Sequence, residues 1–296
     1  MIIKPHEGRG AALAALEALR REPGLDVRRR AGIEGEVRKL RAGEAGERAV
    51  AYELDFHFGP HPNYLVLHGL RLEVGGRVAQ IDHLLVSIFL DSWIIESKTR
   101  QGGLRINELG EFTTLGADGR RVAIDSPVEQ VRRQRTVFRD ALRRKIIRAP
   151  RLLGIVPLLV PCQTVIAVAG DAVIERPEGR VPGVERIVRA DMVGSLVRRD
   201  NLPRGTSLMS HLNLGSTFMT RARLHAFGQS ILAAHRPVAT DWHARFRLPA
   251  ADGQVRCEVC GRGLTPGIVA YCKSQPERFG GRLLCREHQR LHGSEG

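Results

Sequence analysis

Two short apolar runs, residues 80–86 and 93–98, carry charged side chains that could do chemistry together. Asp82 lies in the first run, and Glu96 and Lys98 lie near the end of the second. Side chains alternate between the two faces of a β-strand, so Glu96 and Lys98 share one face. Charged groups in strands this apolar are costly to bury unless they are paired or bind a metal.

An antiparallel hairpin that turns near Phe89 would place Asp82 opposite Glu96, and Leu84 opposite Ile94. Directly opposed residues have Cβ atoms about 4.5–5.5 Å apart. Two carboxylates that close repel each other unless a cation lies between them, and their hard oxygens suit Mg²⁺ or Mn²⁺. A lysine two residues further on could reach a phosphate oxygen at the same ion. The pattern therefore predicts the functional groups of a metal-dependent phosphodiesterase site.

A salt-bridged hairpin on a solvated surface would show the same alternation of charges, so the pattern needs support. One supporting detail is the rarity of lysine, because nearly all other basic residues are arginines. A lysine beside Glu96 indicates a position that favours a compact ammonium over a planar guanidinium. The lysines of the chain are Lys4, Lys39, Lys98, Lys145 and Lys273.

A third carboxylate comes from an amphipathic helix that we expect upstream. Gly43 and Gly46 inside such a helix each cost roughly 1 kcal/mol, which calls for a reason such as close approach of another backbone. Glu47 would then point from the helix towards the hairpin. Alternatively, Glu44 and Glu47 are surface charges and Gly43 breaks the helix. The apolar residues at helical spacing are Val37, Leu40, Val50 and Leu54.

These elements together resemble the nuclease-related domain (NERD) family of the PD-(D/E)xK nuclease superfamily. Two departures from the pattern, Ile81 in place of proline and Ser126 in place of asparagine, remove no metal ligand. The resemblance covers roughly residues 40–140, and its elements, in order, are Gly43 with Gly46-Glu47, Gln80-Ile81-Asp82-His83, Glu96-Ser97-Lys98 with Gly102-Gly103, and Ser126-Pro127-Val128-Glu129-Gln130.

The resemblance implies a restriction-endonuclease-like α/β fold, in which a central mixed sheet is flanked by helices. It implies that Asp82 and Glu96 hold Mg²⁺ or Mn²⁺, with the Ser97 carbonyl as a further ligand, and that Glu47 contributes directly or through water. Lys98 would position or deprotonate the attacking water, or stabilise charge on the phosphate, and Gln130 would orient the site or touch the nucleic-acid backbone. His83 should point to the opposite face, and we interpret it as structural.

A second group of candidate functional residues, cysteines and a histidine, lies near the C-terminus. The pairs Cys257/Cys260 and Cys285/His288 each have two intervening residues, a spacing that can hold one Zn²⁺ tetrahedrally. Cys272 is a fifth candidate: either it replaces His288 as the fourth ligand, or it is a small buried core residue.

This C-terminal segment looks like a treble-clef or ribbon-type finger of the kind appended to bacterial proteins. Such a finger binds nucleic acid or a protein partner. Gly261 would supply the tight turn after the first pair. A segment this short cannot fold without its metal. Cys162, in an apolar strand, is interpreted as packing.

The overall charge favours a polyanionic partner. The formal net charge is +14, and the pI is about 10.6. A helix that begins near Pro127 carries an apolar stripe, Val131, Phe138, Leu142 and Ile146. Its basic stripe, which suits contacts with nucleic-acid phosphates, is Arg132, Arg135, Arg139 and Arg143.

No segment reads as a membrane span, and the N-terminus does not read as a signal peptide, so we expect a cytoplasmic protein with no membrane partner. We divide the chain into a helical extension (1–30) broken near Pro23-Gly24, a nuclease-like domain (31–200), a helical linker (201–250) and a zinc module (251–296). A strand around 184–188 should precede a helix capped by Asp191. Within the linker, residues 211–214 and 221–232 indicate a bridging helix that Pro237 ends.

Two functions remain open: a divalent-metal-dependent nuclease acting on DNA, and a nucleic-acid-binding or scaffold protein that keeps the fold without turnover. Filled positions for all the catalytic groups favour the nuclease. Homo-oligomer formation is common among such nucleases, but no residue demands it.

Overall fold

The computed structural model describes residues 1–22, 25–99, 102–116, 119–170, 172–201, 219–248 and 255–292. They separate into two compact units. The first, called here the sheet unit, comprises residues 1–8 and 41–237, and the second comprises residues 9–40 and 238–296. Helix α2 (Val27–Phe58) contributes its first part to the second unit and the remainder to the sheet unit. The four predicted domain boundaries stay a prediction.

The sheet unit is built on a six-stranded mixed sheet in the order β1-β2-β3-β4-β10-β12. The strands β2, β3 and β4 form an antiparallel meander, whereas β1 pairs parallel to β2, and β10 pairs parallel to both β4 and β12. The predicted α/β architecture with a central mixed sheet is confirmed. The strand bounds are β1 Ile2–Lys4, β2 Tyr64–Val74, β3 Arg77–Ser87, β4 Ser92–Thr99, β10 Cys162–Ala169 and β12 Ile187–Arg189.

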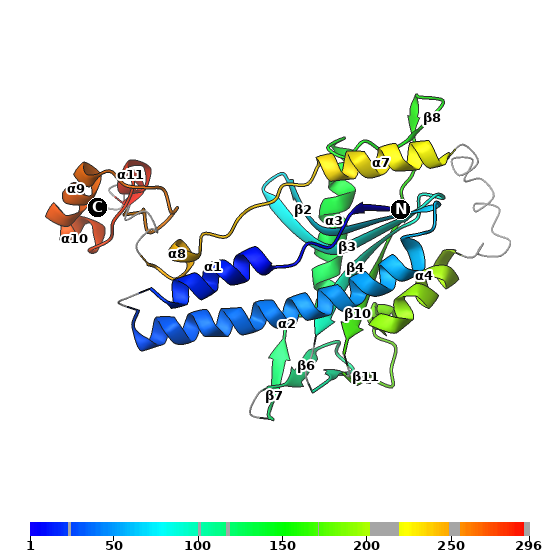
Figure 1. Ribbon diagram of the computed structural model, residues 1–296, viewed down its shortest axis with the longest axis horizontal. Helices are drawn as coiled ribbons and strands as arrows, with labels where there is room; N and C mark the ends of the chain where they lie inside the picture. The colour runs from blue at the N-terminus through cyan, green and yellow to red at the C-terminus, as the bar shows by residue number, and fades with distance from the viewer. Residues whose placement is uncertain are drawn as a thin grey trace. The chain divides into compact units, whose positions relative to one another are not determined.

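Helices cover both faces of this sheet (Figure 1). Helices α3 (Pro127–Arg143) and α7 (Arg221–Ala233) pack on one face, where Phe138 and Phe227 join Leu84 and Ile94 in one core. The sheet-unit part of α2 and helix α4 (Val193–Asn201) pack on the other face against a core that includes Trp93. The central strands are therefore buried on both sides, which explains their nearly continuous apolar sequence.

Local signals fix the ends of α3. Ser126 caps its N-terminus by accepting a hydrogen bond from the Glu129 N–H, and Pro127 occupies the first turn. Lys145 has a φ of 59°, which turns the chain out of the helix. The predicted apolar stripe was wrong at Ile146, because this residue follows the helix end and is 41% exposed, while Ile147 is buried in its place.

Smaller sheets flank the main one. A four-stranded sheet has the order β11-β5-β6-β7 and packs its apolar residues against the start of α3. A separate two-stranded ribbon joins β8 to β9. The bounds are β5 Leu104–Ile106, β6 Phe112–Leu115, β7 Arg121–Ile124, β8 Arg151–Leu152, β9 Val156–Pro157 and β11 Ile174–Glu175.

The second unit has two small apolar clusters. In one, Leu16 and Leu19 of helix α1 (Gly10–Arg20) pack with Ile33 of α2 and with Trp242 of helix α8 (Trp242–Arg245). The other surrounds the cysteines of the C-terminal segment, whose helices are α9 (Pro266–Ser274), α10 (Pro276–Phe279) and α11 (Arg286–His292).

Several local predictions differ from the structure. Residues 2–4 of the expected helical extension form strand β1, since an edge of the sheet is open to them. Helix α7 coincides with the predicted helical run 221–232, but it ends at Ala233, before Pro237, and packs into the core of the sheet unit.

The segment before α4 also differs from its prediction. A 3₁₀ turn (Val184–Arg186) precedes β12, and a second one (Ala190–Met192) contains Asp191, which therefore does not cap the helix. Pro23 and Gly24, and the predicted helical residues 211–214, lie outside the described residues. Among the described residues, no helix has the length and apolar character needed to cross a membrane.

Candidate functional site

Strands β3 and β4 form the antiparallel hairpin on which the predicted site depends. Leu84 pairs with Ile94, as predicted, and His83 pairs with Ile95. The pairing ends there, one step before Asp82 and Glu96. The Asp82 side chain instead reaches across the strands, and its Oδ2 accepts a hydrogen bond of 2.9 Å from the Ser97 N–H.

Asp82 lies at a kink in the sheet. Ladder pairs join His68 to His83 and Leu70 to Ile81, but none joins Gly69 to Asp82. Gly69 has a φ of 62°, a conformation that favours glycine. Ile81 on one side of the kink and Leu84 on the other belong to the same core cluster, so the regular alternation of faces is interrupted between them. The kink aims Asp82 out of the regular strand pattern, towards the end of β4.

The electrostatic surroundings of Asp82 are unfavourable to its charge. Burial, and then the negative charges of Glu96 and Glu47, raise the pKa of Asp82 well above its ordinary value. The Ser97 N–H and the Lys98 ammonium act in the opposite direction but do not cancel this effect. The three carboxyl groups are therefore close enough to interact, and without a cation Asp82 retains a proton to higher pH than an isolated aspartate.

Glu96 is 3% exposed and is held by a network from β4 and α3. Its Oε1 accepts hydrogen bonds from Lys98 Nζ at 2.5 Å and from Gln130 Nε2 at 2.6 Å. Its Oε2 accepts one from Gln134 Nε2 at 2.7 Å. Lys98 Nζ also donates to Gln130 Oε1 at 2.9 Å, so the ammonium bridges the carboxylate and the helix. Glu96, Lys98 and Gln130 are thus brought together.

Gln134 is a site residue that the sequence analysis missed. It is buried, it lies one helical turn after Gln130, and its Nε2 also donates to the Gln80 carbonyl at 2.7 Å. Its Oε1 has no hydrogen-bond partner among the described residues. The i, i+4 spacing of two glutamines on one face of the helix was the available signal.

Helix α2 continues without a break through Gly43 and Gly46, which excludes the alternative of a helix break at Gly43. A Cβ at Gly46 would overlap Thr99 Oγ1 and would lie 3.3 Å from Thr99 Cβ. The expected close approach thus exists, and it lies against the last residue of β4. Glu47, the next residue on the helix, is partly buried and acts on Asp82 as described above.

A hydrogen-bonded chain runs behind these groups. Asp55 Oδ1 lies 3.0 Å from His68 Nε2, the two histidine Nδ1 atoms of His68 and His83 are 2.6 Å apart, and His83 Nε2 lies 2.7 Å from Ser97 Oγ. Burial lowers the pKa of both histidines, so both are neutral near pH 7. The partners then assign the protons: His68 donates to Asp55, His83 donates to His68, and Ser97 donates to His83. His83 therefore supports Ser97, in keeping with its structural interpretation.

Comparison with protein families gives one match over this region. Residues 42–168 match the family model of the nuclease-related domain, NERD. This segment is a nuclease-related domain. Comparisons with curated proteins and with solved structures find no match. The match begins within α2 and ends within β10, and so spans the kinked aspartate, the Glu96 network and helix α3.

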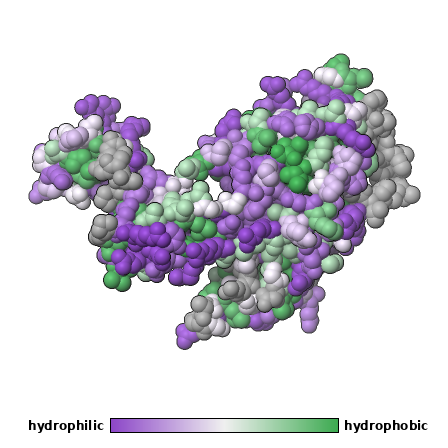
Figure 2. Space-filling view, in the orientation of Figure 1, coloured by the Kyte–Doolittle hydropathy of each residue, from purple (hydrophilic) through white to green (hydrophobic). Residues whose placement is uncertain are grey.

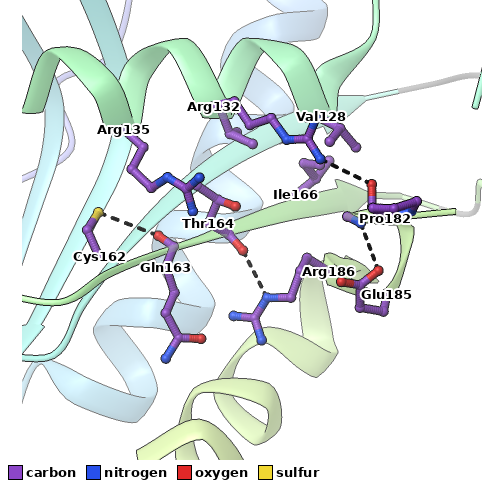
Figure 3. A pocket seen from close by; sticks show the side chains of 12 residues that line it. Val128, Arg132, Arg135, Cys162, Gln163, Thr164, Ile166, Pro182, Glu185 and Arg186 are labelled. Atoms are coloured by element: carbon purple, nitrogen blue, oxygen red, sulfur yellow. Dashed lines mark hydrogen bonds between the residues drawn. The ribbon is translucent and has the colours of Figure 1, made fainter. Parts of the chain in front are cut away.

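Helix α3 of the nuclease-related domain carries the predicted basic stripe beside a cleft of about 300 Å³. Arg132 and Arg135 line this cleft with Thr164 of β10 and Arg186, and Figure 3 shows the arginines reaching into it from both walls. Arg186 is paired with Asp200 by contacts of 3.1 and 2.7 Å. A concave wall with several guanidinium groups suits anions such as phosphates.

The rest of the stripe is exposed. Arg139 and Arg143 lie on the solvent side of α3, and Arg143 Nη1 contacts Asp140 at 3.3 Å. Arg132 pairs with Glu129 on the same helix. Exposed pairs of this kind contribute little to stability, so the arginines can exchange these partners for phosphates at small cost.

In the second unit, the predicted metal ligands Cys257, Cys260, Cys285 and His288 converge. Their donor atoms all lie within 4.8 Å of one another, and no other such group occurs among the described residues. Cys260 and Cys285 have sulfur atoms 3.7 Å apart. A tetrahedron with Zn–S bonds of about 2.3 Å has S–S edges of about 3.8 Å, so the cluster has the dimensions of a zinc site.

Local backbone geometry supports this cluster. Gly261 has a φ of 70° and forms the predicted turn after the first cysteine pair. The backbone N–H of His288 lowers the pKa of the Cys285 thiol to about 6, which favours the thiolate that metals bind. Cys272 is outside the cluster: it is buried, and its sulfur accepts hydrogen bonds from the Leu284 N–H and from Gln289. Of the two alternatives for Cys272, the structure supports the buried core residue.

Proposed function

We propose that the nuclease-related domain is a divalent-metal-dependent nuclease that hydrolyses phosphodiester bonds of DNA. The observation that carries the proposal is the buried carboxyl group of Asp82 beside two other carboxyl groups: burial, and then the charges of Glu96 and Glu47, raise its pKa. Carboxyl groups that remain close together despite their mutual repulsion are typical of a site that binds a cation.

The donor set fits Mg²⁺ or Mn²⁺. Carboxylate oxygens are hard ligands, and Glu96 Oε2 accepts a single hydrogen bond from the described residues, which leaves a lone pair for an ion. Asp82 and Glu96 would hold the ion, with the Ser97 carbonyl as a further ligand. A divalent ion at such a site supplies Lewis acidity towards the phosphate and makes water a better nucleophile.

The remaining groups act on substrate and water. The Lys98 ammonium is fixed by Glu96 and Gln130, and from there it would stabilise charge on the phosphate or orient the attacking water. Gln130 would orient Lys98, and Glu47 would hold water at the α2 side of the site. The hydrogen-bonded histidines would keep Ser97 in place.

The basic stripe would bind the nucleic-acid backbone. Phosphate contacts from arginine give affinity without sequence preference, and the net charge of +14 adds long-range attraction. Arg132, Arg135, Arg139 and Arg143 lie on the same helix as Gln130, so strand binding and catalysis would share one rigid element.

We further propose that the Cys₃His cluster binds one Zn²⁺ as a structural ion. Its four protein donors would close the tetrahedron, which leaves no open position for substrate.

Purified protein incubated with supercoiled, linear and single-stranded DNA, and with RNA, in Mg²⁺ or Mn²⁺ tests the nuclease proposal. We expect cleavage of DNA by the wild type, and its loss in Asp82→Ala and Lys98→Ala. Glu73→Ala, which removes an exposed carboxylate of β2, is the matched control and should cleave normally.

Two results would reject this proposal. Cleavage that survives both active-site substitutions would come from another site or a contaminant. Binding of DNA without cleavage of any substrate, in either metal, would identify a nucleic-acid-binding protein that has the fold without the activity.

A further inference from the structure

Two aromatic side chains project into solvent from helix α2. Tyr52 is 65% exposed and Phe56 is 66% exposed, although aromatic residues usually bury most of their surface. They lie one turn apart, and their rings are stacked, with centroids 6.2 Å apart and an interplanar angle of 21°. Val50 and Leu54 of the same helix are fully buried, so the helix covers the sheet without using this pair.

Cationic side chains flank the aromatic pair. Arg48 is exposed and lies one turn before Tyr52, hence on the same face of α2. On the other side, Arg198 of α4 lies 3.3 Å from His57 Nδ1, and the His57 ring contacts Phe56 edge to face. Helices α2 and α4 run side by side on this face of the sheet (Figure 1).

The two acidic residues beside the pair on α2, Glu53 and Asp55, already have partners. Glu53 pairs with His57 Nε2 at 3.6 Å. Asp55 is turned towards buried His68. In the space-filling view, hydrophilic residues cover most of the visible surface, and hydrophobic residues gather in small areas (Figure 2). Beside the pair, the exposed Arg48 and the Arg198 guanidinium supply positive charge.

The exposed rings are too small to join two copies of the chain. A Tyr or Phe side chain offers about 150–250 Å². With about two-thirds of each exposed, the pair presents roughly 200–330 Å², whereas a stable interface buries about 800 Å² on each partner. A nucleic-acid base needs only a ring face and a cation for its phosphate.

We propose that Tyr52 and Phe56 form a base-stacking platform for single-stranded nucleic acid. The proposal rests on the nuclease function above and names its substrate class. In a duplex the base faces are already stacked, so exposed rings select strands whose bases are free. Tyr52 lies five residues after Glu47 on the same helix, which is about 7.5 Å along the axis and about 140° around it, so the two side chains leave α2 on different faces.

Binding of a fluorescent oligothymidine, and of a duplex of equal length, tests the platform. The full chain is used with EDTA, so that no cleavage occurs. Stacking on one ring contributes about 1–3 kcal/mol, so Tyr52→Ala and Phe56→Ala should each weaken binding of the single strand by about 5- to 150-fold. Duplex binding should change less than twofold. Tyr52→Phe, which keeps the ring, should bind as the wild type does.

Phe89→Ala is the matched control. Phe89 is another exposed aromatic residue, at 47%, in the turn between β3 and β4, and its loss should leave both affinities unchanged. Equal losses for single strand and duplex, or no loss for either, would overturn the platform. So would a wild-type dimer, seen by sedimentation, that the Tyr52→Ala/Phe56→Ala double variant dissociates.

Failure of the platform and failure of the nuclease proposal give different results. Asp82→Ala should abolish cleavage and retain single-strand binding, whereas the double aromatic variant should lose single-strand binding and still cleave duplex DNA in Mg²⁺. If Asp82→Ala cleaves normally while single-strand binding still depends on the rings, the nuclease proposal fails and the platform stands.

Discussion

The Cys₃His cluster takes its donors from one short segment, Cys257 to His288, whereas the carboxylate site takes its groups from α2, β3, β4 and α3. In the first, the donor atoms already have the spacing of a tetrahedron. In the second, carboxyl groups repel one another, and Lys98 and Gln134 hold Glu96 by hydrogen bonds. On the proposed functions, zinc would stabilise the fold of its own module, whereas the divalent ion would bind to a fold that is already formed. A large hydrophobic core positions the carboxylates with or without an ion, but the small C-terminal cluster has no such core.

The largest expected effect follows from removing a ligand of the Cys₃His cluster. Zinc binding to small modules is worth about 10–16 kcal/mol, far more than the apolar cluster around it can replace. Cys257→Ser should therefore release zinc and unfold the C-terminal module, while the sheet unit keeps its own thermal transition. Zinc content per chain and calorimetry check this result.

Two other cysteines serve as controls for that prediction. Cys162→Ser alters a thiol in β10 of the sheet unit and should leave one zinc per chain. Cys272→Ser should retain zinc but lower the stability of the module, because it disturbs a buried sulfur with three hydrogen-bond contacts. Full zinc content in Cys257→Ser would show that this residue is not a ligand.

The next largest effect concerns the lysine of the carboxylate site. Lys98→Arg keeps the charge, but a planar guanidinium cannot occupy the position in which one ammonium contacts both Glu96 Oε1 and Gln130 Oε1. We expect DNA cleavage to fall about a hundredfold with little change in melting temperature. Single-turnover cleavage rates measure this effect. A fully active Lys98→Arg protein would mean that charge alone, without shape, suffices.

The two sites also differ in how well the sequence predicts them. The cysteine cluster is local, so spacing alone indicated Cys257, Cys260 and Cys285 as donors and left the fourth donor open between His288 and Cys272. The β3–β4 register and the start of α3 near Pro127 are also local, and both were predicted.

The groups that the sequence analysis missed depend on contacts between distant segments. Gln134 matters because α3 lies over Glu96, and His68 matters because β2 pairs with β3 and brings it to His83. The kink at Asp82 needs Gly69 from the neighbouring strand. An isolated glycine in an apolar strand is the signal that could have indicated this kink. The role assignments of the site residues stay predictions.

Helix α2 offers a smaller test of how the fold supports the carboxylate site. Gly46→Ala would insert a methyl group against Thr99, and overpacking of this kind costs about 1–3 kcal/mol. Gly35→Ala on the same helix is the matched control, because its nearest neighbour would be the flexible Arg38 guanidinium at 3.9 Å. The control should stabilise the protein by roughly 0.5–1 kcal/mol. Denaturant unfolding distinguishes the two, and equal effects would mean that the contact with Thr99 carries no cost.

The smallest effect concerns the charge of Asp82 and depends on pH. Because the pKa of Asp82 is raised in the folded protein, its proton stabilises the fold fully below the unfolded pKa of about 4, and this contribution is lost as pH rises through the folded pKa. Asp82→Asn carries no such charge, so without metal it should melt higher than the wild type at pH 8, by about 2–4 °C for a gain of roughly 1 kcal/mol. This difference in melting temperature should disappear at pH 4, where Asp82 is protonated in the folded wild type.

Added Mg²⁺ extends this test of Asp82, because an ion bound by the carboxylates should offset their repulsion. It should therefore raise the melting temperature of the wild type at pH 8 and leave that of Asp82→Asn unchanged. Thermal unfolding at both pH values, with and without Mg²⁺, gives all four comparisons. If the difference in melting temperature between the two proteins is the same at pH 4 and pH 8, the charge of Asp82 does not destabilise the fold. The contrast with the Cys₃His cluster would then lose its electrostatic basis.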